Sequence, residues 1–431
     1  MKLLLGHRDV NPNYSDDGGR TSLRHASANG HTGVVKLLLE LGDVNPNRPD
    51  ANCQTPLLCA AVEGHAGVVN LLLERGDVDP NIPDVSYGTP LVCAAIGGHE
   101  GIVKLLLQRD SVSCNKPDEQ GRTPLWHAAS GGHEGVVRLL LELKNIGTDN
   151  LDQEGDTPLH GAARNCHTRV VKLLMEAEGI DPSRLNNNGL TPLLLAAGLR
   201  KEGVVKALLE WKDIDPNRPD NEGRTPLMFA AAVGDEGIVK ILLGHENIDP
   251  NCLDNKGRDP IHLAAAIGRE EVVKLVLQRS DVSPDRPSKE AKTPLHGAAS
   301  AGHEGVVKLL LERKDVDSSR PNNLNQRPLG CAAVHGHQGV VRLLLEREDI
   351  DPNCPNFNGH TTLWLAAMSG KEGVVKVLLE WIDVGPNLPE NQQNGVLRYA
   401  AEFGNEGVAK LLLARGDIDP NYSDAHNRTS L

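Results

Sequence analysis

Seven histidines recur at one place in a repeated stretch, which reads GHEGVVKLLLE from Gly302 and GHTGVVKLLLE from Gly30. The seven are His31, His65, His99, His133, His167, His303 and His337. Imidazole is a common zinc ligand, so this row of histidines raises the hypothesis of a metal site. Two imidazoles on one zinc place their ligating nitrogens within about 4 Å, whereas neighbouring helices pack about 8–10 Å apart. We therefore expect turn residues that hydrogen-bond between helices, and no metal site.

The cysteines fail the same distance test. Cys59 and Cys93 share one place in adjacent units, but a disulfide needs Cα atoms within about 7 Å. Cys331 shares that place and lies much further along the chain. We expect all eight cysteines to be free thiols, as in a cytosolic or nuclear protein.

The recurrent DIDPN segments place oxygens at alternate positions, as the start of a calcium loop does. An EF-hand loop needs Gly at its sixth position and Glu at its twelfth. In the segment around Asp249 these places hold Cys252 and Arg258. We interpret the segment as a solvated turn in which Pro250 fixes φ.

Enzyme motifs are absent from the sequence: it has no GxSxG, P-loop, HExxH or glycine-rich dinucleotide turn. The net charge of −13 argues against a nucleic-acid partner. No apolar run approaches the roughly 18–20 residues that span a bilayer. We therefore expect no catalysis, no cofactor, no nucleic acid and no membrane span.

The triplet TPL or a variant of it returns every 34 residues, and this period organises the whole sequence. Its first residues are Thr21, Thr55, Thr89, Thr123, Thr157, Thr191, Thr225, Asp259, Thr293, Arg327, Thr361, Gly395 and Thr429. A fixed period of this size indicates stacked supersecondary units. It predicts a partial unit at residues 1–20, twelve full units over 21–428 in one continuous solenoid, and the start of another at 429–431.

The unit that begins at Thr123 predicts a pair of helices. Thr123 can cap a first helix that has Pro124 at its first position, and Gly132 ends it. The second helix is apolar around nearly its whole circumference, at Val136, Val137, Leu139, Leu140 and Leu141, so it must be sandwiched between neighbours. A loop rich in Pro, Asn, Asp and Gly, such as residues 213–224, leads to the next unit. The predicted fold is an all-α solenoid of helix-turn-helix units with hairpin loops.

The stretch TPLHGAASAGHEGVVKLLLE, from Thr293 to Glu312, resembles an ankyrin repeat, whose signature is T-P-L-H-x-A with a period of 33. The resemblance covers essentially the whole chain. The unit here is one residue longer, and the signature histidine occurs only at His160, His262 and His296. The resemblance implies non-catalytic protein–protein recognition along the concave face of the inner helices and the hairpin tips. Such arrays are similar to ankyrin-rich proteins of filamentous fungi, which are often tails of larger sensor proteins.

A second period of 170 residues relates two parts of the chain. The tripeptide LQR occurs at residues 107–109 and again at 277–279. The tripeptide KEG occurs at 201–203 with Trp211 after it, and again at 371–373 with Trp381 after it. This is either chance among similar units or duplication of a five-unit block. Duplication would create two related surface patches five layers apart.

Positions 4, 5, 8 and 9 of each unit, counted from the Thr of TPL, vary most and are not held by the core pattern. Their aromatic and apolar residues are Trp126, Phe229, Trp364, Met368, Tyr399, Phe403, Ile96, Val233 and Ile267. Two tryptophans that end second helices and four arginines at one hairpin position complete the candidate set: Trp211, Trp381, Arg48, Arg218, Arg286 and Arg320. Trp, Tyr and Arg are over-represented in interface hot spots, so we expect partner contacts here. The alternatives are packing against neighbouring layers and solubilising charge.

The expected function is a protein–protein interaction scaffold in the cytoplasm or nucleus. Two alternatives stay open: a regulatory tail of a larger signalling ATPase or effector enzyme of which this chain is a fragment, and a repeat store without one specific partner. Solenoids need polar terminal units. Because neither end has a complete one, we expect fraying and end-to-end self-association through uncapped termini.

Overall fold

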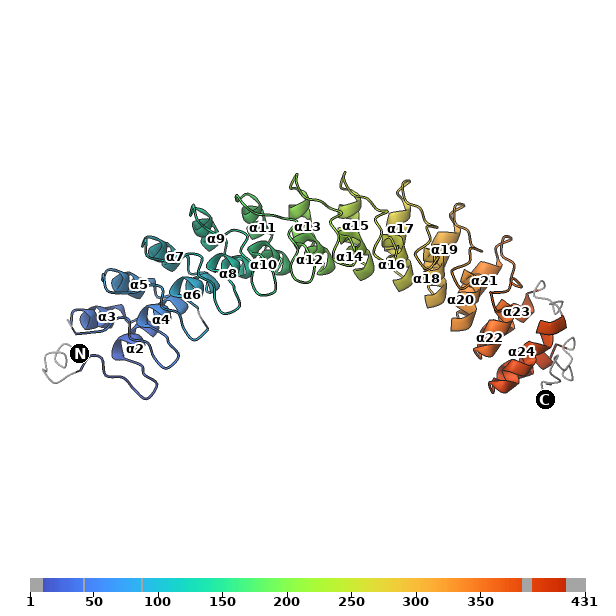
Figure 1. Cartoon of the computed structure of the whole chain (residues 1–431), viewed down its shortest axis with the longest axis horizontal. Helices are drawn as coiled ribbons and strands as arrows, with labels where there is room; N and C mark the ends of the chain where they lie inside the picture. The colour runs from blue at the N-terminus through green and yellow to red at the C-terminus, as the bar shows by residue number, and fades with distance from the viewer. Residues whose placement is uncertain (1–10, 42, 87, 382–389, 416–431) are drawn as a thin grey trace. The chain divides into compact units, whose positions relative to one another are not determined.

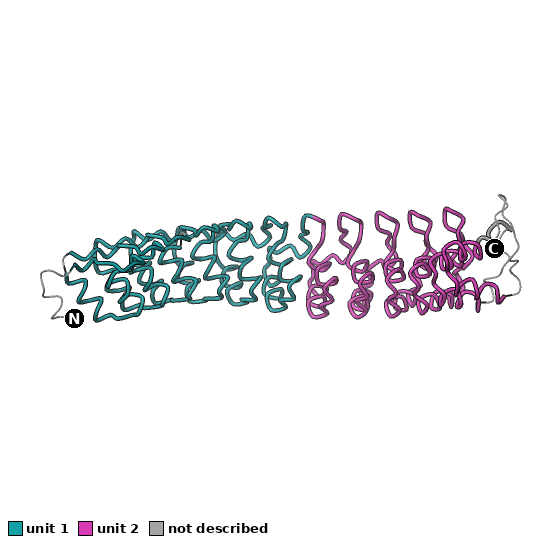
Figure 2. Tube along the Cα trace, turned by 90° about the horizontal axis from the view of Figure 1, so that it is seen from below, with its two compact units in different colours: residues 1–221 teal, residues 222–431 magenta. Residues whose placement is uncertain are grey.

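The computed structural model describes residues 11–41, 43–86, 88–381 and 390–415. The chain divides into two compact units, residues 1–221 (unit 1) and 222–431 (unit 2), which Figure 2 colours separately. The fold is an all-α repeat solenoid with a period of about 34 residues, as the sequence predicted. The expectations about the two chain ends concern residues that lie largely outside the described ranges.

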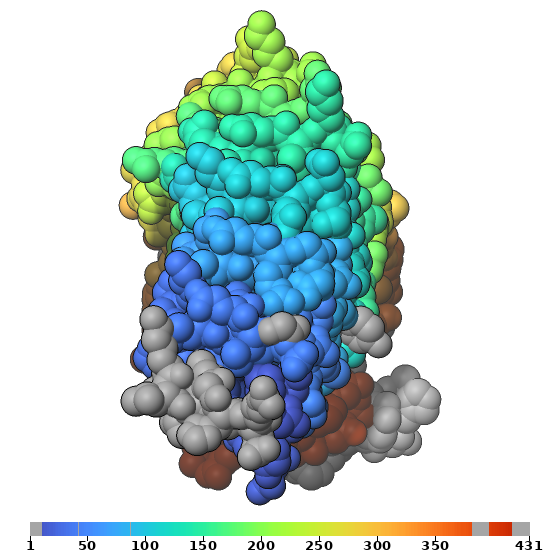
Figure 3. All heavy atoms as spheres, turned by 90° about the vertical axis from the view of Figure 1, so that its left-hand side faces the viewer, coloured from blue at the N-terminus to red at the C-terminus, as the bar shows by residue number. Residues whose placement is uncertain are grey.

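Unit 1 consists of helix pairs, with first helices in one row and second helices in another (Figure 1). The first helices are α2 Ser22–Ala28, α4 Pro56–Val62, α6 Pro90–Ile96, α8 Pro124–Gly131, α10 Pro158–Arg164 and α12 Pro192–Gly198. The second helices are α3 Thr32–Leu39, α5 Ala66–Leu73, α7 Glu100–Leu107, α9 Glu134–Leu141, α11 Thr168–Met175 and α13 Glu202–Leu209. The successive layers of this unit follow one another in Figure 3, seen from the N-terminal end.

Unit 2 repeats the arrangement. Its first helices are α14 Pro226–Val233, α16 Pro260–Ile267, α18 Pro294–Ala301, α20 Pro328–His335, α22 Thr362–Met368 and α24 Glu390–Glu402. Its second helices are α15 Glu236–Leu243, α17 Glu270–Leu277, α19 Glu304–Leu311, α21 Gln338–Leu345, α23 Glu372–Glu380 and α25 Glu406–Leu413. Helix α24 begins before Gly395, where the period places the start of a unit. That unit has no Thr-Pro pair to set the first turn.

Threonine and proline start most first helices, as predicted. The Thr123 hydroxyl accepts a hydrogen bond from the Trp126 backbone N–H at 3.2 Å, and Pro124 occupies the first turn of α8. Gly132 ends α8 in the left-handed conformation at φ 73°, which an L side chain adopts at a cost. The core lies between the helices of adjacent layers. In this unit Leu125 on α8 and Val137 on α9 are fully buried.

Six of the seven repeated histidines link their layer to the one before it. In each case Nε2 donates to a backbone carbonyl at the end of the preceding first helix, at 2.9–3.3 Å. The pairs are His65–Ala28, His99–Val62, His133–Ile96, His167–Ser130, His303–Ala266 and His337–Ser300. These bonds satisfy carbonyls that a helix end leaves without partners. The histidines are therefore structural, and their bonds connect layers rather than the two helices of one unit.

A glycine makes room for each of these histidines. A Cβ at Gly132 would overlap the His167 ring, and a Cβ at Gly302 would overlap the His337 ring. Cys166 occupies the equivalent place with φ 67°, and the next unit has Lys201 where the histidine would be. The glycine of one layer and the histidine of the following layer therefore form a structural pair, which we call the glycine–histidine device.

The DIDPN-type segment does more than form a solvated turn. Its asparagine side chain donates to one backbone carbonyl of the next hairpin and accepts from one backbone N–H there. Asn47, for example, donates to the Asp77 carbonyl at 2.6 Å and accepts from Asp79 N–H at 2.9 Å. The same donor bond occurs at Asn13, Asn81, Asn115 and Asn251. The segment is thus a hydrogen-bonded ladder between layers, which the sequence interpretation missed.

Candidate protein-interaction face

Exposed apolar side chains gather on one side of the helix pairs. Among the described residues, the large exposed apolar side chains lie on first helices and hairpin loops, except Leu413 on α25. They are Tyr14, Val62, Val85, Ile96, Leu151, Leu199, Leu253, Ile267, Leu324, Phe357 and Phe403. We call these residues the apolar face. Scattered exposed apolar residues are ordinary, but their concentration on one side of the layers is informative.

Three of the predicted contact residues are well exposed: Ile96 (52% exposed), Ile267 and Phe403 (57%). The others at the variable helix positions, apart from Trp364, are half-buried: Trp126, Phe229, Val233, Met368 and Tyr399. Phe229 lies beneath the Arg224 guanidinium, at 4.8 Å from the ring centroid. A half-buried ring of this kind packs on its neighbours and still presents an edge to solvent.

Trp364 is a correction. The sequence placed it on the surface, but it is only 8% exposed. Its ring stacks on His360 with centroids 3.3 Å apart and meets the edge of Tyr399 at 5.1 Å. Tyr399 in turn stacks on Phe403 at 6.4 Å. His360 and the neighbouring layer thus cover Trp364, and Phe403 is the exposed end of this aromatic row.

Three of the four hairpin arginines contact the preceding layer. Arg48 donates to the Asn13 carbonyl at 3.0 Å and Arg286 to the Asn251 carbonyl at 3.1 Å. Arg320 forms an ion pair with Asp285 at 2.8 Å. Arg218 is exposed. The cation at this position therefore connects successive hairpins.

Trp211 and Trp381 are half-buried, and they stand where other repeats have an arginine that contacts the preceding layer. Most other repeats have arginine at this position. The arginine side chain donates a hydrogen bond to a carbonyl at the end of the preceding second helix. This bond is made by Arg75, Arg109, Arg279, Arg313, Arg347 and Arg415. The tryptophans therefore stand where the fold elsewhere uses a contact between layers, which favours packing over partner contact.

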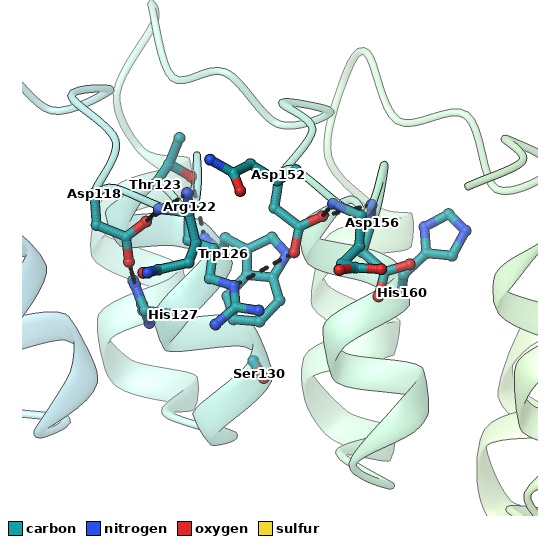
Figure 4. A network of polar contacts seen from close by, with 12 residues as sticks. Asp118, Arg122, Thr123, Trp126, His127, Ser130, Asp152, Asp156 and His160 are labelled. Atoms are coloured by element: carbon teal, nitrogen blue, oxygen red, sulfur yellow. Dashed lines mark hydrogen bonds and ion pairs between the residues drawn. The ribbon is translucent and has the colours of Figure 1, made fainter. Parts of the chain in front are cut away.

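A polar network surrounds Trp126 in unit 1 (Figure 4). The Arg122 guanidinium lies 4.4 Å from the Trp126 ring centroid, and its Nε reaches the Asp152 carboxylate at 3.4 Å. His127 Nε2 contacts the Asp118 carboxylate at 2.7 Å. Burial lowers the pKa of His127, and the Asp118 hydrogen bond opposes that shift. The network fixes the indole against the layer and leaves part of its ring on the surface.

The signature histidines at position 4 are buried parts of the fold. His296 Nδ1 lies 3.0 Å from the Thr293 hydroxyl, and Nε2 donates to the Gln326 carbonyl at 3.1 Å. Burial lowers the pKa of His296 to about 4, so the ring is neutral at pH 7. His160 and His262 make the same contact to the next hairpin. These histidines connect layers and carry no chemistry.

An open groove of about 560 Å³ lies in unit 2 between two hairpins and helices α16 and α18. Its rim carries Lys256, Arg258, Lys289, Glu290 and Lys292. Its floor is made of small residues, which are Ala266, Gly297, Ser300 and Ala301. Lys292 bonds to Glu290 at 2.9 Å. The Lys292 hydrogen bond, followed by the charges of Lys292, Lys256 and Arg258, lowers the pKa of Glu290.

The described part of the chain has no cluster of metal ligands, and its cysteines form no disulfide. No group of three His, Cys, Asp or Glu residues there is placed to hold a metal ion. The eight cysteines are free, as predicted. Burial raises the pKa of Cys59 to about 11 and of Cys93 to about 12. These two thiols stay protonated, and thus unreactive, at neutral pH.

The sequence analysis expected contacts at the hairpin tips but named no apolar residue there. Phe357 is 73% exposed, and Leu324 and Val85 are also exposed. A signal existed, because these apolar residues stand at positions 31 and 32, where most units have polar or charged residues. They enlarge the apolar face beyond the first helices.

The paired helices, the clamps between layers and the exposed face define a helical repeat protein. A family model for ankyrin repeats (3 copies) matches residues 1–84, 77–152, 142–220, 201–286, 280–356 and 348–424. The chain therefore belongs to the ankyrin repeat family, as the sequence resemblance indicated. Ankyrin repeats are generally protein–protein interaction modules and are typically non-catalytic.

Two further searches give negative findings. Among curated proteins, no match to the chain is found. In the described ranges, no helix has the length and apolar character to cross a membrane.

Proposed function

We propose that this protein is a non-catalytic scaffold that binds partner proteins through its first helices and hairpin tips. The observation that carries the proposal is the one-sided distribution of exposed apolar side chains, from Val62 to Phe403. Second helices instead present charged residues at exposed positions, such as Lys104 and Lys240. Burial of apolar surface drives most protein association, so the partner should lie on the apolar face.

The proposal revises the contact residues. Ile96, Ile267 and Phe403 remain candidates because they are exposed, and Phe357 joins them. Trp364 leaves the set because the neighbouring layer covers it. The half-buried rings, such as Trp126, can add edge contacts.

The test begins with a binding partner selected from a displayed library of protein fragments and then purified. Its affinity is measured by calorimetry for the wild type, Ile96→Ser and Phe357→Ser. Hot-spot residues cost about 2 kcal/mol or more on truncation, which is about a thirtyfold loss of affinity. We expect such a loss in at least one of the two variants.

Two exposed neighbours provide matched controls. Lys104→Ser changes the second helix of the Ile96 unit, and Asn358→Ser changes the residue beside Phe357. Both controls should bind as the wild type does. A partner whose affinity falls with Lys104→Ser and with neither apolar variant binds the second-helix row and contradicts the proposal.

A further inference from the structure

The groove of unit 2 differs from the rest of the apolar face in charge. Four cationic side chains, Lys256, Arg258, Lys289 and Lys292, line a groove whose only acidic lining residue is Glu290. This is unusual in a chain of net charge −13. The cations come from two successive hairpins and face the same open space.

Two of the four cations form no ion pair among the described residues. Arg258 pairs with the buried Asp254 at 2.7 Å, and Lys292 pairs with Glu290. Lys256 and Lys289 are exposed and form no ion pair with any residue that the structure describes. Their charges are therefore available to a ligand.

The floor of the groove is formed by small residues. Gly297 has no Cβ, and an added one would lie 3.2 Å from the Ala266 Cβ, so α16 and α18 pack closely there. Ser300 and Ala301 continue this floor of small residues. An extended peptide can thus lie over the helices while its side chains reach the hairpin lysines.

The equivalent place in unit 1, 170 residues earlier, lacks these features. Ser86 and Glu119 stand where unit 2 has Lys256 and Lys289. Trp126 and His127 stand where unit 2 has His296 and Gly297. The basic, open character therefore belongs to the unit 2 groove and does not follow from the repeat itself.

We propose that the unit 2 groove binds an extended segment of a partner protein rich in Asp and Glu. This deepens the proposed function and rests on it, because it assigns a partner chemistry to one part of the interaction face. Carboxylates of such a segment complement Lys256 and Lys289, and complementary charge increases both specificity and association rate. A peptide is favoured over nucleic acid because two lysines without ion pairs match a few spaced carboxylates, whereas affinity for a continuous phosphate backbone depends on many cations.

The experiment uses a fluorescein-labelled peptide that alternates Glu with Gly, and measures its binding to the full chain by fluorescence anisotropy at 0.05 M salt. We expect saturable binding that weakens at 0.5 M salt, because salt screens exposed charge. The matching Gln–Gly peptide should not bind. An oligothymidylate of equal charge should bind more weakly than the Glu–Gly peptide.

Two double variants locate the site. Lys256→Ala with Lys289→Ala should weaken binding about tenfold, since each lost contact of this kind is worth a few-fold in affinity. Lys240→Ala with Lys308→Ala removes the same charge from second helices of the same unit and should change the affinity less than about twofold. Circular dichroism checks that both variants stay folded.

Three results would overturn the proposal: no binding of the Glu–Gly peptide, equal losses in the two double variants, or tighter binding of the oligothymidylate. None of these results would contradict the proposed scaffold function, because that function is tested separately with the Ile96 and Phe357 variants. Loss of partner binding in those apolar variants together with failure of the acidic peptide would keep the scaffold and remove only the acidic groove.

Discussion

Two places 170 residues apart share one scaffold and present different surfaces. In unit 1 this place carries exposed Val85 and Ile96 beside the half-buried Trp126. In unit 2 the corresponding region is a groove with Lys256 and Lys289 on its rim. Each place is built from the same helix pair and hairpin. The comparison teaches that recognition can change from apolar to basic without any change in the fold.

What the two places share is the set of contacts between layers. His133 and His303 make the same bond to the preceding first helix. Thr123 and Thr293 begin the two equivalent helices. Substitutions at shared positions should therefore affect stability in both units, and substitutions at variable positions should affect binding in one.

The largest effect should come from Trp364, which stands at position 4, as Trp126 does. Trp364→Ala should lower the free energy of unfolding by about 3–5 kcal/mol, because it removes a buried ring and leaves a cavity. Trp126→Ala should cost clearly less because that ring is half-buried. Urea denaturation followed by circular dichroism measures both. Equal losses would contradict this distinction between the two tryptophans.

The next effect is a pH dependence specific to the buried histidines. The pKa of His296 is about 4 in the folded chain, against about 6.5 when unfolded, so the unfolded chain binds this proton at higher pH. Stability should be complete above pH 6.5 and fall by about 3 kcal/mol as the pH is lowered to about 4. His296→Leu, which places the residue of Leu194 at the same position, should flatten this fall. An unchanged slope in denaturation curves between pH 7 and pH 4.5 would refute the assignment to His296.

Disrupting the glycine–histidine device should lower the free energy of unfolding by about 2 kcal/mol. Gly132→Ala in unit 1 and Gly302→Ala in unit 2 both force an L residue into the left-handed region and push it into the next histidine ring. We expect similar losses of unfolding free energy in the two variants. Cys166→Gly is the reciprocal change, and it should stabilise by about 1 kcal/mol because it relieves a non-glycine residue at positive φ. A loss in only one of the two glycine variants would show that the device is not shared.

The smallest effect should come from the asparagine ladder. Asn47→Ala removes two hydrogen bonds to the next hairpin and should cost about 1–2 kcal/mol. Asn251→Ala removes the equivalent bonds in unit 2. Asn52→Ala, an exposed neighbour, is the control and should be nearly neutral. Thermal unfolding of all three variants measures whether the ladder contributes to stability in both units.

The sequence predicted the fold well because the fold is local and periodic. Thr-Pro starts, the glycine stops and the apolar second helices each lie within one unit. Burial at the surface positions was harder, because it depends on residues one layer away. Trp364 is covered by Tyr399, 35 positions later, and Arg320 is held by Asp285, 35 positions earlier. Ile96 and Phe403 lie at variable positions and are exposed, as the sequence pattern predicted.

The most direct test transfers the surface of one place onto the other. Ser86→Lys with Glu119→Lys gives unit 1 the two lysines of the unit 2 groove, and His127→Gly, the residue of Gly297, opens its floor. Titration calorimetry with the Glu–Gly peptide counts the sites. If the layers are a shared scaffold and the variable positions set recognition, this triple variant should bind two peptides per chain where the wild type binds one. A folded triple variant that still binds one peptide would contradict the claim that these positions set recognition.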